Sequence, residues 1–304
     1  HEIGCRVRSK GLARILSDVF ELDWSLAEDV VCGPSEAKAP VNAVSESASA
    51  GSEATAEPPT PAIETARPAP AEPPSEASEA TRPKLAPHPK TAGFALKQYE
   101  LPLTGIARAA GTGRPDTFEV WPVYSPSGLI PDERLWDEPR LVSLIDGARS
   151  EVVVQLLSYS CLDNNEYYDV LDAALRRAAA RRVSVKLLVS DWSKSHPAVD
   201  CLKSLEVLPN IEVRLSTIPE WSGGFVPYSR VEHCKYMVVD GKACWIGTSN
   251  WARSYFHTCR NVGLIIAGKS ISETLRQVFQ KSWDSKYAYP VRPELEYAPP
   301  KRDG

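Results

Sequence analysis

The stretch that decides the fold reads RLVSLIDGARSEVVVQLL over residues 140–157. Its first part, 140–148, repeats apolar side chains three and four positions apart, which predicts an amphipathic helix. Its last part, 151–157, is a near-continuous apolar run, which is typical of a buried strand. The same order recurs downstream, with helices predicted at about 167–181 and 199–205 and strands at 183–189 and 211–215. Helices alternating with apolar strands predict an α/β sandwich with a mostly parallel or mixed β-sheet.

Three compositional zones divide the 304 residues. Residues 1–30 have a globular pattern, and an amphipathic helix is predicted around 12–20. Residues 31–95 are rich in Pro, Ala, Ser and Glu: twelve of the 26 prolines lie between Pro34 and Pro89, where aromatic residues are absent. Such a segment cannot bury enough apolar surface to offset its ordering entropy, so we predict a disordered insertion. Residues 96–304 form the third zone and contain the alternating helices and strands.

Charge and cysteine usage narrow the class of partner and site. A net charge of −4 gives no global attraction to nucleic acid or anionic membrane, so a phosphate would have to be held by local groups. No run of 18 apolar residues is present. The seven cysteines are scattered without metal-site spacing, so we expect neither a metal site nor a disulfide framework. The compartment stays open between an endomembrane or lysosomal lumen and a bacterial or cytosolic location.

An internal repeat relates the two ends of the sequence. A shift of 259 positions aligns residues 4–24 with residues 263–283 without a gap, so that Val19-Phe20 meets Val278-Phe279 and Trp24 meets Trp283. The alternative is chance similarity between two amphipathic helices, but the gap-free match ending on a tryptophan favours a duplicated strand and helix. We therefore expect residues 1–30 to be the end of a first half, whose remainder lies before position 1.

One segment of the sequence has a pattern of polar residues suited to catalysis or phosphate binding. It reads HCKYMVVD over residues 233–240 and GTSN over 247–250, which is H-x-K-x4-D followed by G-T-x-N. Asp240-Gly241 predicts a two-residue hairpin turn, with His233 opposite Thr248 and Lys235 opposite Ile246. Strand alternation would then put His233, Lys235, Thr248 and Asn250 on one face, a set suited to a phosphodiester. Asp240 lies at the turn, so we expect it to orient structure. The alternative is that His233 and Lys235 are ordinary residues of a hairpin without a catalytic role.

This segment resembles the HKD motif of the phospholipase D superfamily. The longer runs 227–237, 246–251 and 254–256 are similar to the branch containing animal lysosomal 5′ exonucleases and poxvirus envelope phospholipase-like proteins. Ser125-Pro126-Ser127-Gly128 and Trp283-Asp284-Ser285 support the resemblance, which covers about 118–290 and, through the repeat, 2–24. It implies a phospholipase D-like α/β sandwich half-domain with a mixed β-sheet flanked by helices.

The resemblance also implies a mechanism. Two histidines from two halves face each other across one phosphate; one attacks phosphorus, and the other protonates the leaving oxygen and then activates water. By analogy His233 is the general acid and later base. Lys235 and Asn250 would hold the non-bridging oxygens, so no metal or other cofactor is implied. Glu2 fits the place of a carboxylate that orients the opposing histidine, whereas its repeat mate is Asn261, an amide that cannot stabilise an imidazolium as a carboxylate does.

Four further residues are predicted to bind substrate. Thr248 and Ser249 belong to the GTSN run, and the aromatic rings of Tyr228 and Trp251, which flank the motif, are expected to stack on bases. Cys234 alternates away from His233, so we expect it to be buried and inert.

The function expected from the resemblance is hydrolysis of phosphodiester bonds, at a nucleic acid 5′ end or in a phospholipid, through a phosphohistidine intermediate. The partners are then single-stranded nucleic acid or phospholipid, together with an amino-terminal HKD half or a second copy of this chain. Without that second half the chain is expected to be inactive. The alternative is a catalytically degenerate phospholipase D-like protein that acts as a membrane-associated or binding module.

Overall fold

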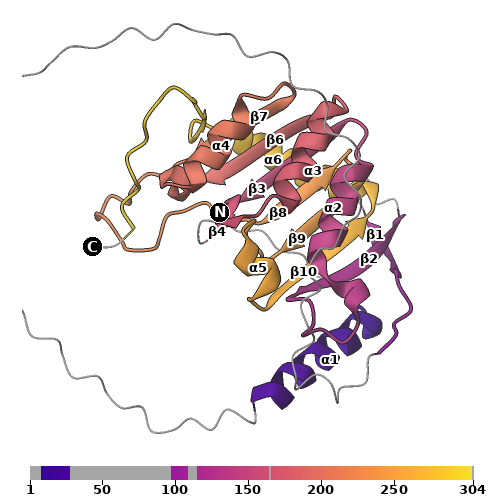
Figure 1. Ribbon diagram of the computed structural model, residues 1–304. Coiled ribbons are helices and arrows are strands. Elements are labelled where there is room, and N and C mark those ends of the chain that lie inside the picture. Colours follow the sequence, from indigo (N-terminus) through magenta and orange to yellow (C-terminus); the bar gives the residue numbers. More distant parts are fainter. Residues whose placement is uncertain (1–7, 28–96, 109–114, 164–165, 303–304) are drawn as a thin grey trace, which may run out of the picture. The chain divides into compact units, whose positions relative to one another are not determined.

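A mixed β-sheet lies at the centre of the fold (Figure 1). The computed structural model describes residues 8–27, 97–108, 115–163 and 166–302. These residues fall within one unit of the chain, His1–Glu28 together with Leu85–Gly304. The predicted insertion at 31–95 and Glu2 lie outside the described residues, so the predictions made for them stay predictions.

Three parallel strands alternate with helices, as the sequence predicts. They are β3 (Glu151–Leu156), β6 (Ser184–Ser190) and β7 (Ile211–Ser216), with Val152 opposite Val185 and Val185 opposite Ile211. The helices between and before them are α2 (Asp137–Gly147), α3 (Val170–Ala180) and α4 (Ala198–Glu206). Short 3-10 helices, η2 (Glu133–Leu135) and η3 (Asp191–Lys194), precede α2 and α4.

Antiparallel strands complete the sheet in the order β1-β2-β10-β9-β8-β3-β6-β7-β11. Their bounds are β1 Leu103–Arg108, β2 Pro115–Ser125, β8 Tyr236–Val239, β9 Ala243–Gly247, β10 Asn261–Ala267 and β11 Ala288–Pro290. A separate two-stranded sheet pairs β4 (Leu162–Asp163) with β5 (Glu166–Tyr167). The prediction of a mixed sheet flanked by helices is therefore confirmed, although periodicity did not predict β1, β2 or β11.

Helices cover both faces of the sheet (Figure 1). On one face α2, α3 and α4 share a buried apolar cluster with Val152 and Val154 of β3. On the other face α6 (Lys269–Trp283) packs on Val153 through Leu275 and Phe279. Because successive side chains of a strand point to opposite faces, a strand covered on both faces must be apolar throughout. This arrangement explains the apolar run 152–154 of β3, and the one buried polar side chain beyond it, Gln155, accepts a hydrogen bond from Tyr236 Oη.

Two predicted helix starts differ from the structure. The helix predicted from residue 140 begins at Asp137, since acidic residues are favourable at the positive end of a helix and Pro139 fits a first turn. The helix predicted from about residue 167 begins at Val170, because Glu166 and Tyr167 instead pair with β4. Both errors are of boundaries, and the helices themselves are confirmed.

The helical part of the repeat is present in both copies. The first copy is α1 (Lys10–Ala27). In the alignment with a shift of 259, its first residue, Lys10, corresponds to Lys269, the first residue of α6. The two helices bury different stripes, however. In α6 Leu275 and Phe279 face the sheet, whereas α1 packs through Ile15 and Val19. The strand expected at residues 4–7 lies outside the described residues, so the duplication stays a prediction.

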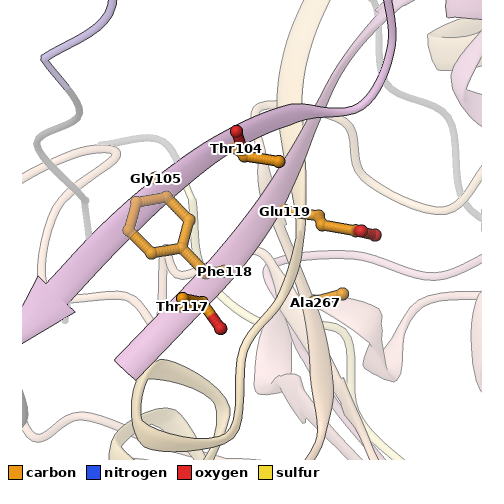
Figure 2. Close-up of a pocket in the computed structure, with 6 residues that line it drawn as sticks. All are labelled: Thr104, Gly105, Thr117, Phe118, Glu119 and Ala267. Carbon is orange, nitrogen blue, oxygen red and sulfur yellow. The ribbon is translucent and has the colours of Figure 1, made fainter. Parts of the chain in front are cut away.

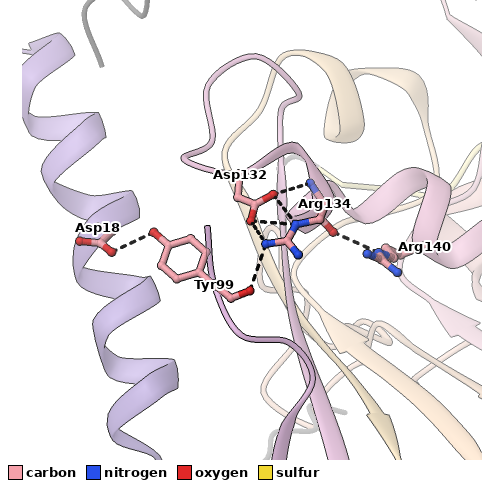
Figure 3. Close-up of polar contacts among 5 residues, drawn as sticks. All are labelled: Asp18, Tyr99, Asp132, Arg134 and Arg140. Carbon is pink, nitrogen blue, oxygen red and sulfur yellow. Dashed lines mark hydrogen bonds and ion pairs between the residues drawn. The ribbon is translucent and has the colours of Figure 1, made fainter. Parts of the chain in front are cut away.

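The contact between α1 and the rest of the unit combines apolar and polar groups. Ile15 and Val19 pack against Tyr124, Ile130 and Leu135. Asp18 accepts hydrogen bonds from Lys97 Nζ at 2.5 Å and Tyr99 Oη at 2.8 Å, and Figure 3 shows the second of these.

The backbone of Tyr99 is in turn bound by the segment before α2. Arg134 donates to Tyr99 O at 3.0 Å and to both carboxylate oxygens of Asp132 (Figure 3). Arg140 then donates to Arg134 O at 3.0 Å. A series of hydrogen bonds through side chains and backbone carbonyls therefore connects α1 to the start of α2.

One prediction about cysteines is wrong. Cys161, in the segment after β3, forms a disulfide with Cys201 of α4. The two positions are 40 residues apart and fit no short spacing motif, so the sequence pattern alone gave no signal. They meet because β3 and β6 run parallel, so the segments that leave their carboxyl ends lie at the same edge of the sheet.

Cys201→Ser should lower the free energy of unfolding by about 2–4 kcal/mol, because the disulfide restricts a long loop of the unfolded chain. Urea denaturation under non-reducing conditions measures the change. Cys259→Ser is the matched control, since this exposed cysteine is outside the disulfide. Equal midpoints for the wild type and Cys201→Ser would show that the bond contributes nothing to stability.

Candidate active site

The hairpin that carries the motif has a longer turn than predicted. Tyr236 pairs with Ile246 and Val239 with Ala243, which leaves three residues, Asp240-Gly241-Lys242, in the turn. Asp240 and Gly241 both have left-handed backbone conformations, with φ of 52° and 61°. Asp and Gly tolerate this region better than most residues. The predicted two-residue turn is therefore wrong by one residue, and so is the register derived from it.

The corrected register puts Lys235 opposite Gly247, whose N–H donates to Lys235 O at 3.1 Å. His233 lies two residues earlier and is exposed. Lys235 is only 7% exposed, and its ammonium donates to His233 O at 3.0 Å. A buried lysine is uncommon and implies that its charge has partners nearby. The structure thus presents an imidazole at the surface with an ammonium held against its backbone.

Thr248 and Ser249 are engaged by the protein itself. The Thr248 hydroxyl donates to Asn261 Oδ1 at 2.9 Å and accepts from Val262 N at 3.1 Å, so it bridges to β10. The Ser249 hydroxyl is buried and donates to Asp137 Oδ2 at 3.1 Å. The prediction that Thr248 and Asn250 share a strand face with Lys235 is wrong, because the one-residue shift in register reverses the alternation and β9 ends at Gly247.

Asn250 is fixed by the segment that follows β3. Its Oδ1 accepts a hydrogen bond from Ser158 N at 3.1 Å, which assigns Nδ2 as the group able to donate to a substrate oxygen. The two segments also pair through their backbones: Ser160 N donates to Trp251 O at 2.8 Å and Trp251 N donates to Ser158 O at 3.2 Å. The carboxyl end of β3 therefore positions the GTSN run.

The two aromatic residues that flank the motif have different environments. The Trp251 indole is 1% exposed and packs beside Trp245 in the core, with ring centroids 6.4 Å apart. A buried ring cannot stack on a base, so that role for Trp251 is wrong; its position after β9 turns it inward. Tyr228, in contrast, is 66% exposed and lies on the loop that leads into the motif.

Asp240 connects the hairpin turn to the start of β3. Its carboxylate accepts hydrogen bonds from Arg149 N, Ser150 N, Ser150 Oγ and Glu151 N, at 2.7–2.9 Å. Partial burial would raise the pKa of this carboxyl, but these hydrogen bonds outweigh burial and lower its pKa below the ordinary value. Asp240 lies at the far end of β8 from His233. The expectation that it orients structure is confirmed.

Asp240→Ala should lower the free energy of unfolding by about 2 kcal/mol at pH 7, because three backbone N–H groups and one hydroxyl lose their shared acceptor. A lowered pKa means that this contribution is present above the ordinary value of 3.8 and is lost as the pH falls through the lower folded value. Urea denaturation at pH 7 and below pH 4 should therefore show a gap between wild type and variant that narrows in acid.

Asp146→Ala is the control for this experiment. Asp146 forms an exposed ion pair with Arg177, and such pairs contribute at most about 1 kcal/mol. A gap between wild type and Asp240→Ala that stays constant with pH would contradict the assigned role of the carboxylate.

Two buried acids at the start of α2 were not predicted as site residues. Asp137 accepts the Ser249 hydroxyl, and its Oδ1 has no hydrogen-bond partner among the described residues. Burial raises the pKa of Asp137 well above its ordinary value. Glu138 accepts Tyr168 Oη at 2.6 Å and His257 Nε2 at 3.0 Å. Their sequence signal, an acidic pair in a first helical turn, is the same as that of an ordinary helix start.

Asp137→Asn should be more stable than the wild type at pH 7.5 by about 1–3 kcal/mol, because an amide of the same shape needs no proton to stay neutral. A raised pKa means that the wild type loses stability as the pH rises above the ordinary value of 3.8. Thermal or urea unfolding from pH 4 to pH 8 should show a steeper decline for the wild type. Parallel curves for the two proteins would contradict a neutral buried Asp137.

Other titratable groups near the motif have structural environments. Cys234 is buried, and burial raises the pKa of its thiol to about 12, as expected for an inert cysteine. On α3, Arg176 pairs with Asp172 at 2.5 Å and Arg177 pairs with Asp146 at 2.8 Å.

A hollow of about 640 Å³ lies elsewhere, on β1, β2 and β10. Figure 2 shows the residues that line it: Thr104, Gly105, Thr117, Phe118, Glu119 and Ala267. None of the motif residues lines this hollow, so we do not assign the chemistry of the motif to it. Across the described ranges, no three His, Cys, Asp or Glu side chains gather in a way that could hold a metal ion. No described helix is long and apolar enough to cross a membrane.

A family model covers the region of the motif. Residues 141–283 match the family model described as "Cardiolipin synthase, PLD-like domain". Phospholipase D Z of Dictyostelium discoideum is 33% identical over 183 residues, covering 58% of this chain and 43% of that protein. The 5′-3′ exonuclease PLD4 of Mus musculus is 35% identical over 185 residues, covering 54% and 37%.

A viral protein matches over a similar length. The virion nicking-joining enzyme of Vaccinia virus (strain Western Reserve) is 36% identical over 197 residues, covering 60% of this chain and 45% of the viral protein. The chain therefore spans less than half the length of each of these relatives.

Proposed function

Because the chain belongs to the phospholipase D superfamily over residues 141–283, we propose that it supplies one half of a phosphodiesterase active site. The reaction is hydrolysis of a phosphodiester through a phosphohistidine intermediate. The substrates to be tested are a nucleic acid with a free 5′ end and a phospholipid. Relatives with names of both kinds, exonuclease and phospholipase, support this range.

One observation carries the proposal: backbone N–H groups hold the main chain of Lys235 and the side chain of Asn250, the two polar residues that follow an exposed histidine in the motif. Gly247 N–H binds Lys235 O, and Ser158 N–H binds Asn250 Oδ1. Tyr236 pairs with both Gln155 of β3 and Ile246 of β9, so β8 enters the sheet between these two strands. His233 consequently emerges where the segments holding Asn250 and Ser158 meet. Such preorganised donors suit the charge that develops on a phosphoryl group.

The roles in the reaction follow from these positions. In the first step a histidine nitrogen forms a bond to phosphorus while the bond to the leaving oxygen breaks, and the second histidine gives that oxygen a proton. In the second step water attacks phosphorus, the P–N bond breaks, and the second histidine accepts the proton of the water. We assign His233 to the second role. Lys235 and Asn250 Nδ2 stabilise the non-bridging oxygens through both steps.

This mechanism needs two histidines, and the sequence contains one H-x-K-x4-D. We propose that the second histidine comes from another HKD segment of a longer protein or from a second copy of this chain. The two sources differ in a measurable way. If a second copy supplies it, the specific activity rises with protein concentration in step with dimer formation.

A specific observation favours a second candidate, a phosphate-binding module without catalysis. Asn261 stands where the repeat predicts the counterpart of the carboxylate Glu2. Its Nδ2 donates to Tyr255 O at 2.8 Å and its Oδ1 accepts from Thr248, so its amide is fixed within the structure. An amide cannot stabilise an imidazolium as a carboxylate does, which weakens the support for the opposing histidine, the nucleophile of this mechanism.

His233→Ala should reduce hydrolysis at least about 10³-fold, and Lys235→Met about 10²–10³-fold, because one variant loses the proton donor and the other a charge-stabilising group. The assay compares a 5′-hydroxyl single-stranded DNA with phosphatidylcholine vesicles, over a range of protein concentrations. His196→Ala is the matched control, since His196 is an exposed histidine paired with Asp200.

An acid-quenched reaction should also contain a phosphorylated histidine. Unchanged hydrolysis in His233→Ala would contradict the assigned role. Binding of either substrate without turnover, in an assembly that contains two HKD motifs, would support the binding module instead.

A further inference from the structure

An exposed aromatic turn precedes the motif in the loop between β7 and β8. Trp221-Ser222-Gly223-Gly224 closes through a hydrogen bond from Gly224 N to Trp221 O at 2.9 Å, and the same two residues form an antiparallel bridge. Gly224 has a φ of 102°, a conformation that side chains other than hydrogen rarely adopt. The turn therefore has a defined backbone despite its exposure.

The turn holds the Trp221 indole against its own backbone. A Cβ added at Gly223 would lie 2.3–2.6 Å from the ring atoms Cζ3, Cη2 and Cε3, so only glycine leaves room for the ring. The indole is nevertheless 57% exposed. One side of the ring is thus supported by the loop while much of it faces solvent. An aromatic ring held in this way loses little further freedom when a ligand binds.

Other aromatic rings and cations lie along the same loop. Tyr228 is largely exposed and packs edge-on against Trp192, with centroids 6.2 Å apart. The Lys301 ammonium lies 4.2 Å from the Phe225 ring centroid, and the Arg302 guanidinium lies 5.3 Å from that of Trp192. The loop and the carboxyl-terminal segment are joined by a hydrogen bond from Tyr228 N to Arg302 O at 3.2 Å.

The loop lies at the edge of the sheet where the candidate active site is. The parallel strands β3, β6 and β7 end at one edge; Trp192 follows β6, and the loop follows β7. The loop then returns to the start of β8 and the motif. His233 lies five positions after Tyr228, a span of at most about 17 Å when extended.

We propose that Trp221, together with Tyr228, is a stacking platform for unpaired bases of a single-stranded nucleic acid whose phosphate reaches His233. The proposal rests on the proposed function and names its substrate class. Bases stack on aromatic rings regardless of sequence, and adjacent cations meet the phosphates. A membrane-inserting tryptophan would have to project away from the protein, whereas this indole is folded onto Gly223.

The test measures binding of the full chain to a 3′-labelled oligothymidylate with a 5′-hydroxyl, by fluorescence anisotropy. Trp221→Ala should weaken binding about ten-fold, and Trp221→Phe should weaken it less, because a ring remains. Gly223→Ala should resemble Trp221→Ala, since the added methyl group displaces the indole. An abasic strand of the same length should bind the wild type and Trp221→Ala equally, because it has no bases to stack.

Each outcome decides the proposal. An equal loss for normal and abasic strands in Trp221→Ala would overturn stacking. Unchanged oligonucleotide binding combined with lost binding to phosphatidylserine vesicles would overturn it in favour of a membrane surface. Base-dependent binding through Trp221 without cleavage would leave the platform standing while the proposed catalysis fails, so the two claims are separable.

Discussion

The register of one strand, β8, determines the geometry of the candidate site. At one end, Asp240 accepts four hydrogen bonds from residues 149–151 and so fixes where the hairpin meets β3. At the other end, Gly247 N–H closes the ladder on Lys235. A slip of one residue would move every side chain of β8 to the opposite face of the sheet. Lys235 would then leave the side on which it approaches the backbone of His233.

The surrounding sheet makes this register costly to change. The apolar side chains of β8 are buried on both faces, Met237 among residues of α2, α3 and α4 and Val238 among residues of α6. The Asn250 amide is held by the backbone N–H of Ser158, which follows β3, and not by another mobile side chain. A site built in this way needs little rearrangement to bind a phosphate, and this preorganisation is the main physical support for a catalytic role.

The sequence predicted the layered α/β fold because its signal is local: apolar runs and helical periodicity in residues 140–215 appear again as β3, β6, β7 and their helices. It also predicted that Cys234 is buried. Features that depend on distant pairing were missed. Asp240-Gly241 is compatible with two turn lengths, Cys161 and Cys201 meet only through parallel strand packing, and Asp137 contacts Ser249 across 112 residues. Trp251 was assigned to substrate because it flanks the motif in the sequence, whereas its ring is in the core.

The most direct test is a crystal structure of the chain with orthovanadate, which mimics a phosphoryl group in transfer. Our account predicts vanadate with an apical oxygen hydrogen-bonded to a ring nitrogen of His233, and with Lys235 Nζ and Asn250 Nδ2 on the equatorial oxygens. Lys235 would then have left His233 O for the oxyanion. Vanadate bound elsewhere, or bound at His233 while Lys235 and Asn250 keep their present partners, would contradict the central claim that these three residues form a phosphoryl-transfer site.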